Sequence, residues 1–236
     1  MESDVTHSIK WGFLLSSLLL SACASPPKES GGAEEESRSV ELPALRSDSS
    51  YCADSIEPRS PKVARIKEVD DLTKIHQKGK EARRYALEHG MNLRFCFLLD
   101  FSYDLYTRRF FVYDLLDSRV METALVSHGH GEGNTESRVV FSNVIGSNCS
   151  SLGKYRVGER AYSQRGVHFH YKLHGLESTN SNAFQRSVVL HSFEYFGCDS
   201  PCLVSEGCAI VCDDMMLYLD ELLKSEKKPT LLWIFQ

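Results

Sequence analysis

The sequence predicts a mainly β domain with flanking helices, an α+β fold. Short runs rich in aliphatic, β-branched and aromatic residues begin at Leu93 and are separated by turn-forming residues. These runs predict strands at 94–100, 108–114 and 119–126. Residues 167–174 alternate apolar and polar side chains, which predicts a further strand with one buried face.

Helices are predicted on the N-terminal side of this β-rich region. Ser60 and Pro61 are a helix-start signal, because serine caps the first turn and proline fits its first position. Gly79 is expected to weaken or break the helix, and a second helical piece over 80–88 is expected to stop at Gly90. The apolar residues that follow the start signal are spaced by three: Val63, Ile66, Val69, Leu72 and Ile75.

A further helix is predicted directly after Cys212. Asp213 and Asp214 lie in its first turn and lysines lie near its end, which suits the helix dipole. Pro229 ends it, and 230–235 is expected to form a closing strand. Its apolar stripe is typical of a core-facing helix and comprises Met215, Met216, Leu219, Leu222 and Leu223.

The N-terminus carries an export signal. Lys10 precedes an apolar run over 11–20 that is too short to span a bilayer. The small residues before Cys23 resemble a bacterial lipobox, which implies cleavage before Cys23 and attachment to the membrane through a lipid on its thiol. The alternative is a plain secretory signal with a chance cysteine. Ala24 and Ser25 favour the cell envelope, at the periplasmic face of the outer membrane.

Four segments follow from these signals. They are a lipoprotein signal peptide (1–22), an acidic and polar linker (23–60), an N-terminal helical segment (61–91) and the β-rich domain (92–236). The net charge of -5 and the lack of any lysine or arginine cluster argue against a nucleic-acid partner.

The chemistry-bearing stretch is Leu203-Val204-Ser205-Glu206-Gly207-Cys208-Ala209-Ile210-Val211. Cys208 follows a glycine between two apolar runs, as a nucleophile on a tight turn would, and His191 ends an upstream apolar run. Cysteine reacts as the thiolate, and an imidazole can take its proton. Gly207 would let the main chain approach closely, so that the N–H groups of Gly207 and Cys208 could face an oxyanion.

Ser205-x-Gly207-Cys208 behind an upstream histidine resembles the murein L,D-transpeptidase catalytic-domain family. Further stretches resemble that family in the same order, over about 95–235. These are Asp100-Phe101-Ser102, Val126 to Gly131, Phe141-Ser142-Asn143, Gly146-Ser147, Ser150 to Gly153 with Tyr155, Leu173 to Glu177 with Asn180, Asn182, Ala183 and Arg186, and Val188 to His191.

The resemblance implies a β-sandwich that acts on peptidoglycan stem peptides without a metal or organic cofactor. Cys208 would attack a tetrapeptide stem, D-alanine would leave, and an acceptor amine would resolve the thioester. His191 would be the base, and Ser205 would hold the turn or form a hydrogen bond near the site. Substrate-side roles are expected for His128, Gly129, Ser192 and Glu206, although His128 could equally be structural.

Glu206 is a departure from the family pattern, because a carboxylate beside the thiol disfavours the thiolate unless it points away or orients His191. Two other functions stay open. Water could be the acceptor, which gives an L,D-carboxypeptidase. Alternatively the protein is a non-catalytic envelope-binding lipoprotein, with Cys208 in a disulfide to Cys202 or Cys212.

The remaining cysteines allow many pairings, because six cysteines can pair in about fifteen ways. Cys198 and Cys202 are the first guess for a disulfide, since both precede the nucleophile and an exported protein can hold disulfides. Metal binding is disfavoured at His168 and His170, where no carboxylate is near in sequence, and at cysteines 198, 202, 208 and 212, whose spacing is not typical of zinc sites.

Overall fold

The structure is a computed structural model that describes residues 65–236. The predicted signal peptide, the lipid site Cys23, the linker and the helix start at Ser60 and Pro61 all lie outside the described residues. Within residues 65–236, no helix is long and apolar enough to cross a membrane.

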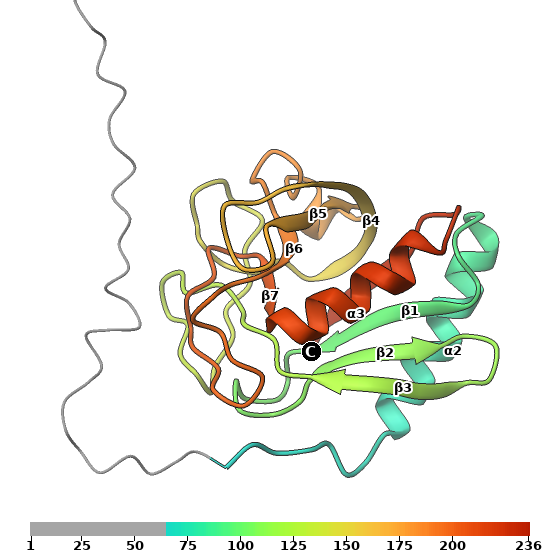
Figure 1. Ribbon diagram of the computed structural model, residues 1–236, viewed down its shortest axis with the longest axis horizontal. Coiled ribbons are helices and arrows are strands. Elements are labelled where there is room, and N and C mark those ends of the chain that lie inside the picture. The colour runs from blue at the N-terminus through green and yellow to red at the C-terminus, as the bar shows by residue number, and fades with distance from the viewer. Residues whose placement is uncertain (1–64) are drawn as a thin grey trace, which may run out of the picture. The chain divides into compact units, whose positions relative to one another are not determined.

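One sheet of eight strands dominates the described part of the chain (Figure 1). Its order is β3-β2-β1-β8-β4-β5-β6-β7, and its neighbours are antiparallel except for the pairs β1–β8 and β6–β7. The strands are β1 (Phe95–Asp100), β2 (Phe110–Asp114), β3 (Arg119–Ala124), β4 (Gly153–Tyr162), β5 (Phe169–Gly175), β6 (Val189–Ser192), β7 (Ala209–Val211) and β8 (Leu231–Phe235).

This architecture confirms the mainly β fold class with flanking helices. The two layers expected for a sandwich belong to one continuous sheet whose ends approach each other, since Ser127 beyond β3 pairs with Ile210 of β7. The predicted strand 167–174 is confirmed as β5, and its alternation is real: Phe169, Tyr171 and Leu173 are buried.

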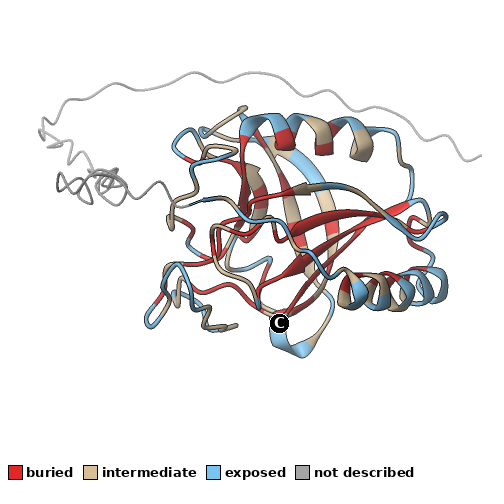
Figure 2. Ribbon diagram, turned by 90° about the horizontal axis from the view of Figure 1, so that it is seen from below, coloured by how far each residue is buried: buried red, intermediate tan, exposed pale blue. Residues whose placement is uncertain are grey.

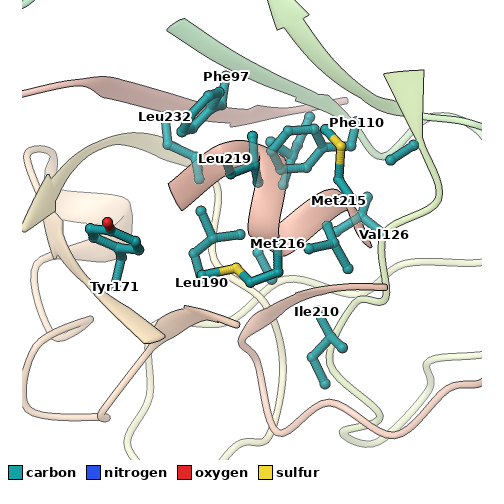
Figure 3. Packing of buried hydrophobic residues seen from close by; sticks show 14 of the residues in the cluster. Phe97, Phe110, Val126, Tyr171, Leu190, Ile210, Met215, Met216, Leu219 and Leu232 are labelled. Carbon is teal, nitrogen blue, oxygen red and sulfur yellow. The ribbon is translucent and has the colours of Figure 1, made fainter. Parts of the chain in front are cut away.

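Helix α3 (Asp213–Lys224) lies against the inner face of the sheet and forms the main core. Its residues Met215, Met216 and Leu219 pack in one buried cluster with Phe97 of β1, Phe110 of β2 and Leu190 of β6 (Figure 3). Burial of each such side chain stabilises the fold by about 1.5–3 kcal/mol. The predicted C-terminal helix and its apolar stripe are therefore confirmed for these three residues.

Helix α2 (Thr73–Glu88) covers the opposite face of the sheet, over β1, β2 and β8. Its buried residues Ile75, Ala82 and Ala86 face a second cluster that includes Tyr113 and Trp233. Both helices therefore present one buried and one exposed side (Figure 2).

The predicted break at Gly79 is wrong, because α2 continues through it. A Cβ at this position would overlap the ring of Tyr113, so the glycine lets the helix approach the sheet closely. The helix also begins later than predicted, since Lys67 pairs with Thr107 in extended conformation. Its end is as predicted: Gly90 follows with a φ of 65°.

Candidate active site

Strands β6 and β7 place Cys208 and His191 on the same face of the sheet. The two strands are parallel, with Leu190 opposite Ala209 and His191 opposite Ile210. Leu190 and Ala209 are buried in the core, so the neighbouring side chains His191 and Cys208 point to the other face of the sheet, where both are half-buried. Cys208, one residue before β7, is thus a diagonal neighbour of His191, at a spacing of about 7–8 Å that a long or aromatic side chain can cross.

The Cys208 side chain is a thiol that belongs to no disulfide. Its sulfur contacts the carbonyl oxygen of Ser187 at 3.8 Å. Burial raises the pKa of this thiol to about 11; the Val189 N–H and Arg186 oppose that rise, and Glu206 adds to it. The thiol is therefore protonated at neutral pH, and its reaction needs a base.

His191 has the form that such a base requires. Its Nδ1 lies 2.9 Å from the carbonyl oxygen of Ser192, which can only accept a hydrogen bond. Nδ1 therefore carries the proton and Nε2 carries the free electron pair. Burial, opposed by the Ser192 hydrogen bond and aided by nearby His170, lowers the pKa of His191 to about 4. The imidazole is neutral at physiological pH.

Ser205 holds the turn in front of the nucleophile. Its Oγ accepts a hydrogen bond from the Gly207 N–H at 3.0 Å and donates one to the Cys208 carbonyl at 2.7 Å. The expectation that the Gly207 N–H faces an oxyanion is thereby corrected, since Ser205 already occupies this donor. Gly207 has a φ of 110°, and a Cβ there would lie 2.6 Å from the Cys149 carbonyl oxygen. This position requires glycine.

The surroundings of His128 fit the structural alternative to its expected substrate-side role. The side chain is fully buried, and both of its nitrogens are occupied. Nδ1 accepts a hydrogen bond from Arg109 at 2.7 Å, and Nε2 donates one to the Thr135 carbonyl at 3.0 Å. Burial and the Arg109 charge lower the pKa of His128 to about 3. This histidine is a neutral structural group.

Gly129 and Ser192, for which substrate-side roles were expected, are both buried and hydrogen-bonded within the protein. Gly129 is buried, its N–H donates to Ser150 Oγ at 3.0 Å, and a Cβ would overlap the Asn148 carbonyl. Ser192 is fully buried, and its Oγ accepts a hydrogen bond from the Val167 N–H at 3.0 Å. Its carbonyl accepts a hydrogen bond from His191 Nδ1 and so orients the base, and a substrate contact by Ser192 stays a prediction.

Glu206 is the one expected substrate-side residue that the structure exposes. Its carboxylate influences the thiol through its charge, because it contributes to the raised pKa of Cys208. A substrate contact by Glu206 stays a prediction.

The sequence predicted no specific role for Arg186 or Ser187. Both contact the turn that carries the nucleophile or the loop packed against that turn. The Arg186 guanidinium donates to the carbonyls of Cys149 and Ser142 and reaches Ser151 Oγ at 3.3 Å. It therefore clamps the loop on which Gly207 packs. Ser187 has a φ of 57°, an uncommon conformation for a residue with a side chain, and its carbonyl meets the thiol. Arg186 could be found only through its place in the family motif, and Ser187 has no sequence signal.

The loop before the nucleophile is held by a disulfide between Cys198 and Cys212, whose Cα atoms are 5.1 Å apart. The predicted pair of Cys198 with Cys202 is therefore wrong. Cys212, directly after β7, lies next to Cys198 only in the folded chain. The closeness of Cys198 and Cys202 in the sequence therefore did not predict the disulfide. Since Cys212 is occupied and Cys208 is a thiol, the disulfide expected for a non-catalytic protein is wrong as well.

Residues 67–235 match the family model described as the L,D-transpeptidase catalytic domain. The chain belongs to this family, and the resemblance seen in its motifs is confirmed. The match supports a transpeptidase-type enzyme that acts on peptidoglycan. No curated protein sequence matches the chain.

Two solved structures are similar at low identity. The crystal structure of the L,D-transpeptidase (residues 123–326) from Xylanimonas cellulosilytica DSM 15894 is 15% identical with a TM-score of 0.36, over 64% of this chain and 68% of that one. The structure of Bdellovibrio bacteriovorus Bd1075 is 14% identical with a TM-score of 0.39, over 62% of this chain. The match spans about half of that second chain, 49%.

Proposed function

We propose that the protein is a peptidoglycan L,D-transpeptidase that uses Cys208 to form a thioester with a tetrapeptide stem. The observation that carries this proposal is the shared sheet face of the Cys208 thiol and a neutral His191 whose Nδ1 is fixed on the Ser192 carbonyl. That arrangement leaves Nε2 as the proton acceptor on the face of the sheet that carries the nucleophile.

In the first step, Cys208 Sγ attacks the carbonyl carbon that joins the third residue of the stem to D-alanine. A C–S bond forms and the amide C–N bond breaks. The thiol proton passes to His191 Nε2 and from there to the departing amine of D-alanine. In the second step, an acceptor amine attacks the thioester carbonyl, a new amide forms, and its proton returns through His191 to the sulfur.

The experiment is intact-protein mass spectrometry of the lipid-free protein after incubation with a carbapenem. An active thiol opens the strained β-lactam amide and gains the whole mass of the drug as a thioester. We expect one adduct on the wild type, located by peptide mapping on Cys208, and none on Cys208→Ala. His191→Gln should be acylated about 10²–10⁴ times more slowly, the usual contribution of a general base.

No adduct on the reduced wild type, or equal acylation of His191→Gln, would contradict the proposal. The acceptor is identified with a purified tetrapeptide stem as substrate. Cross-linked dimers indicate transfer to an amine. Free tripeptide stems with no dimers indicate the L,D-carboxypeptidase reaction instead.

We also propose that Cys23 is lipidated and holds the protein at the periplasmic face of the outer membrane. The apolar run and the small residues before Cys23 support this proposal. Metabolic labelling with a fatty acid should mark the wild type and not Cys23→Ala. Label retained on the variant would contradict it.

A further inference from the structure

A row of three outward-facing residues crosses the sheet at the level of the nucleophile. Lys172 of β5 lies opposite Val189 of β6, and the β6–β7 register places Val189 beside Cys208. Neighbouring strands are about 4.8 Å apart, so the Lys172 and Cys208 backbones are about 10 Å apart. His170 and His191 form the next row. Strands β5, β6 and β7 run next to one another in Figure 1.

The ammonium group of Lys172 has no carboxylate partner within residues 65–236. Its Nζ lies 5.3 Å from the ring centroid of Phe184, a cation–π contact. Lys154 and Lys74, by contrast, form ion pairs with Glu177 and Asp100. The positive charge of Lys172 also affects a neighbouring histidine. Burial and, second to it, the charge of Lys172 lower the pKa of His170.

Phe184 completes a surface beside this ammonium group. Its side chain is 56% exposed, unusual for a large apolar residue, and its ring stacks on His174 at 5.0 Å. His174 is itself engaged with Glu159 at 3.2 Å. Lys172 and Phe184 therefore present, next to the nucleophile row, a cation without a carboxylate partner among residues 65–236 and a largely exposed aromatic side chain.

Arg186 is another cation close to Cys208, but both of its terminal nitrogens, Nη1 and Nη2, already donate hydrogen bonds. They are directed at the carbonyls of Cys149 and Ser142 and at serine hydroxyls. Lys172 therefore brings to the nucleophile row an ammonium group with no ion-pair partner among residues 65–236.

The donor peptide of the proposed reaction carries such an anion. Its last residue, D-alanine, has a free carboxylate one residue beyond the carbonyl that Cys208 attacks. An enzyme that removes only this terminal residue must distinguish a chain end from a chain interior. Lys172 stands in the same row as Cys208, two strands away, and a lysine side chain is long enough to meet a carboxylate at that distance.

We propose that Lys172, with Phe184 beside it, binds the terminal carboxylate of the donor peptide and makes the enzyme specific for a free C-terminal end. Lys172 is a specificity-determining residue in this scheme, and the inference rests on the proposed function. Loss of a hydrogen bond to a charged group corresponds to about a 10-fold to 100-fold change in rate.

The test compares two donor tetrapeptides that differ only in their last group, a free carboxylate or a carboxamide. Release of D-alanine or D-alaninamide gives kcat/KM for each peptide. The wild type should prefer the acid by about 10-fold to 100-fold. Lys172→Met should lose this preference by becoming slower on the acid alone, and Lys172→Arg should retain most of it.

Arg156→Met is the matched control. Arg156 lies on the same face, on β4 opposite His174, so the variant removes an equal charge from a more distant strand. Arg156→Met should keep the preference for the acid peptide. If it loses that preference, the peptide carboxylate is attracted by the overall positive charge of this face, and the proposed site at Lys172 is disproved.

Two further outcomes separate this inference from the proposed function. If the wild type converts both peptides equally, or if Lys172→Met keeps full discrimination, the inference is overturned while the proposed function stands. If the wild type converts neither peptide and forms no carbapenem adduct, the proposed function fails and the inference fails with it.

Discussion

Two side chains of opposite charge influence the pKa of the Cys208 thiol. Glu206 raises its pKa and Arg186 lowers it, both on top of the larger effect of burial. Glu206 is exposed, whereas Arg186 is held by carbonyls beneath the turn. The reactivity of the thiol therefore depends on a balance that single substitutions can move in either direction.

Glu206→Gln and Arg186→Met should shift the thiol pKa in opposite directions. Removal of the carboxylate lowers the pKa, so alkylation of Cys208 by iodoacetamide at pH 9 becomes faster. Removal of the guanidinium raises the pKa and slows alkylation at the same pH. The measurement is the alkylation rate at Cys208 from pH 7 to 11, with Arg186→Lys as the control that keeps the charge. Shifts of the same sign for Glu206→Gln and Arg186→Met would disprove this account.

At the scale of single elements, α2 depends on the absence of a side chain at Gly79. Alanine forms helices better than glycine by about 1 kcal/mol. The ring of Tyr113 occupies the space that an alanine Cβ would need, so overpacking opposes that gain. Packing on the sheet, rather than helix propensity, decides this position.

Gly79→Ala should reduce the free energy of unfolding by about 1–3 kcal/mol, the usual cost of overpacking. Urea unfolding measures the change, and exposed Lys80→Ala should stay within about 0.5 kcal/mol of the wild type. In a Tyr113→Val background, where the space is open, Gly79→Ala should become stabilising. If it destabilises both backgrounds equally, contact with Tyr113 is not the cause.

The disulfide of Cys198 and Cys212 closes the loop that carries Cys208, with a sequence separation of 14. A loop of this size corresponds to about 3 kcal/mol of stability in the chain-entropy model. The double variant Cys198→Ala/Cys212→Ala should lose about that much in urea unfolding and should also react more slowly with a carbapenem. Exposed Ser200→Ala, within the same loop, should change neither quantity. Unchanged stability in the double variant would refute the role of the crosslink.

At the scale of the whole described chain, residues 65–236, the burial of His128 and His191 keeps both groups neutral, and this predicts acid sensitivity. The pKa values of His128 and His191 are lowered to about 3 and about 4, whereas both groups titrate near their ordinary value of 6.5 once unfolded. Below about pH 6.5 the unfolded chain binds more protons than the folded one. The stability is therefore fully present above that pH and is lost as the pH falls toward 4 and then 3.

Urea unfolding between pH 5 and 6 tests this prediction. Each neutral histidine contributes a slope of about 1 kcal/mol per pH unit in this window, because it is protonated only in the unfolded chain. His191→Gln should reduce the slope by that amount, and exposed His89→Gln serves as the control for a lost histidine. An unchanged slope in His191→Gln would show that the fold does not hold this group neutral.

Features that depend on residues close together in the chain could be predicted from the sequence alone. Alternation over 167–174 predicted β5, the acidic first turn and apolar stripe predicted α3, and the ordered motifs around Cys208 predicted the family. The glycine before Cys208 likewise predicted a tight turn. These signals are local because strand periodicity, helix capping and turn conformation are set over a few residues.

Contacts between residues far apart in the sequence became known only from the folded structure. His128 is buried against Arg109, the end of β7 brings Cys212 to Cys198, and the Tyr113 ring fills the space beside Gly79 of α2. The β5–β6–β7 register sets Lys172 in line with Cys208. These contacts and the pKa shifts of the buried groups depend on desolvation and on cross-strand neighbours. Both arise from the packing of segments that are distant in the sequence.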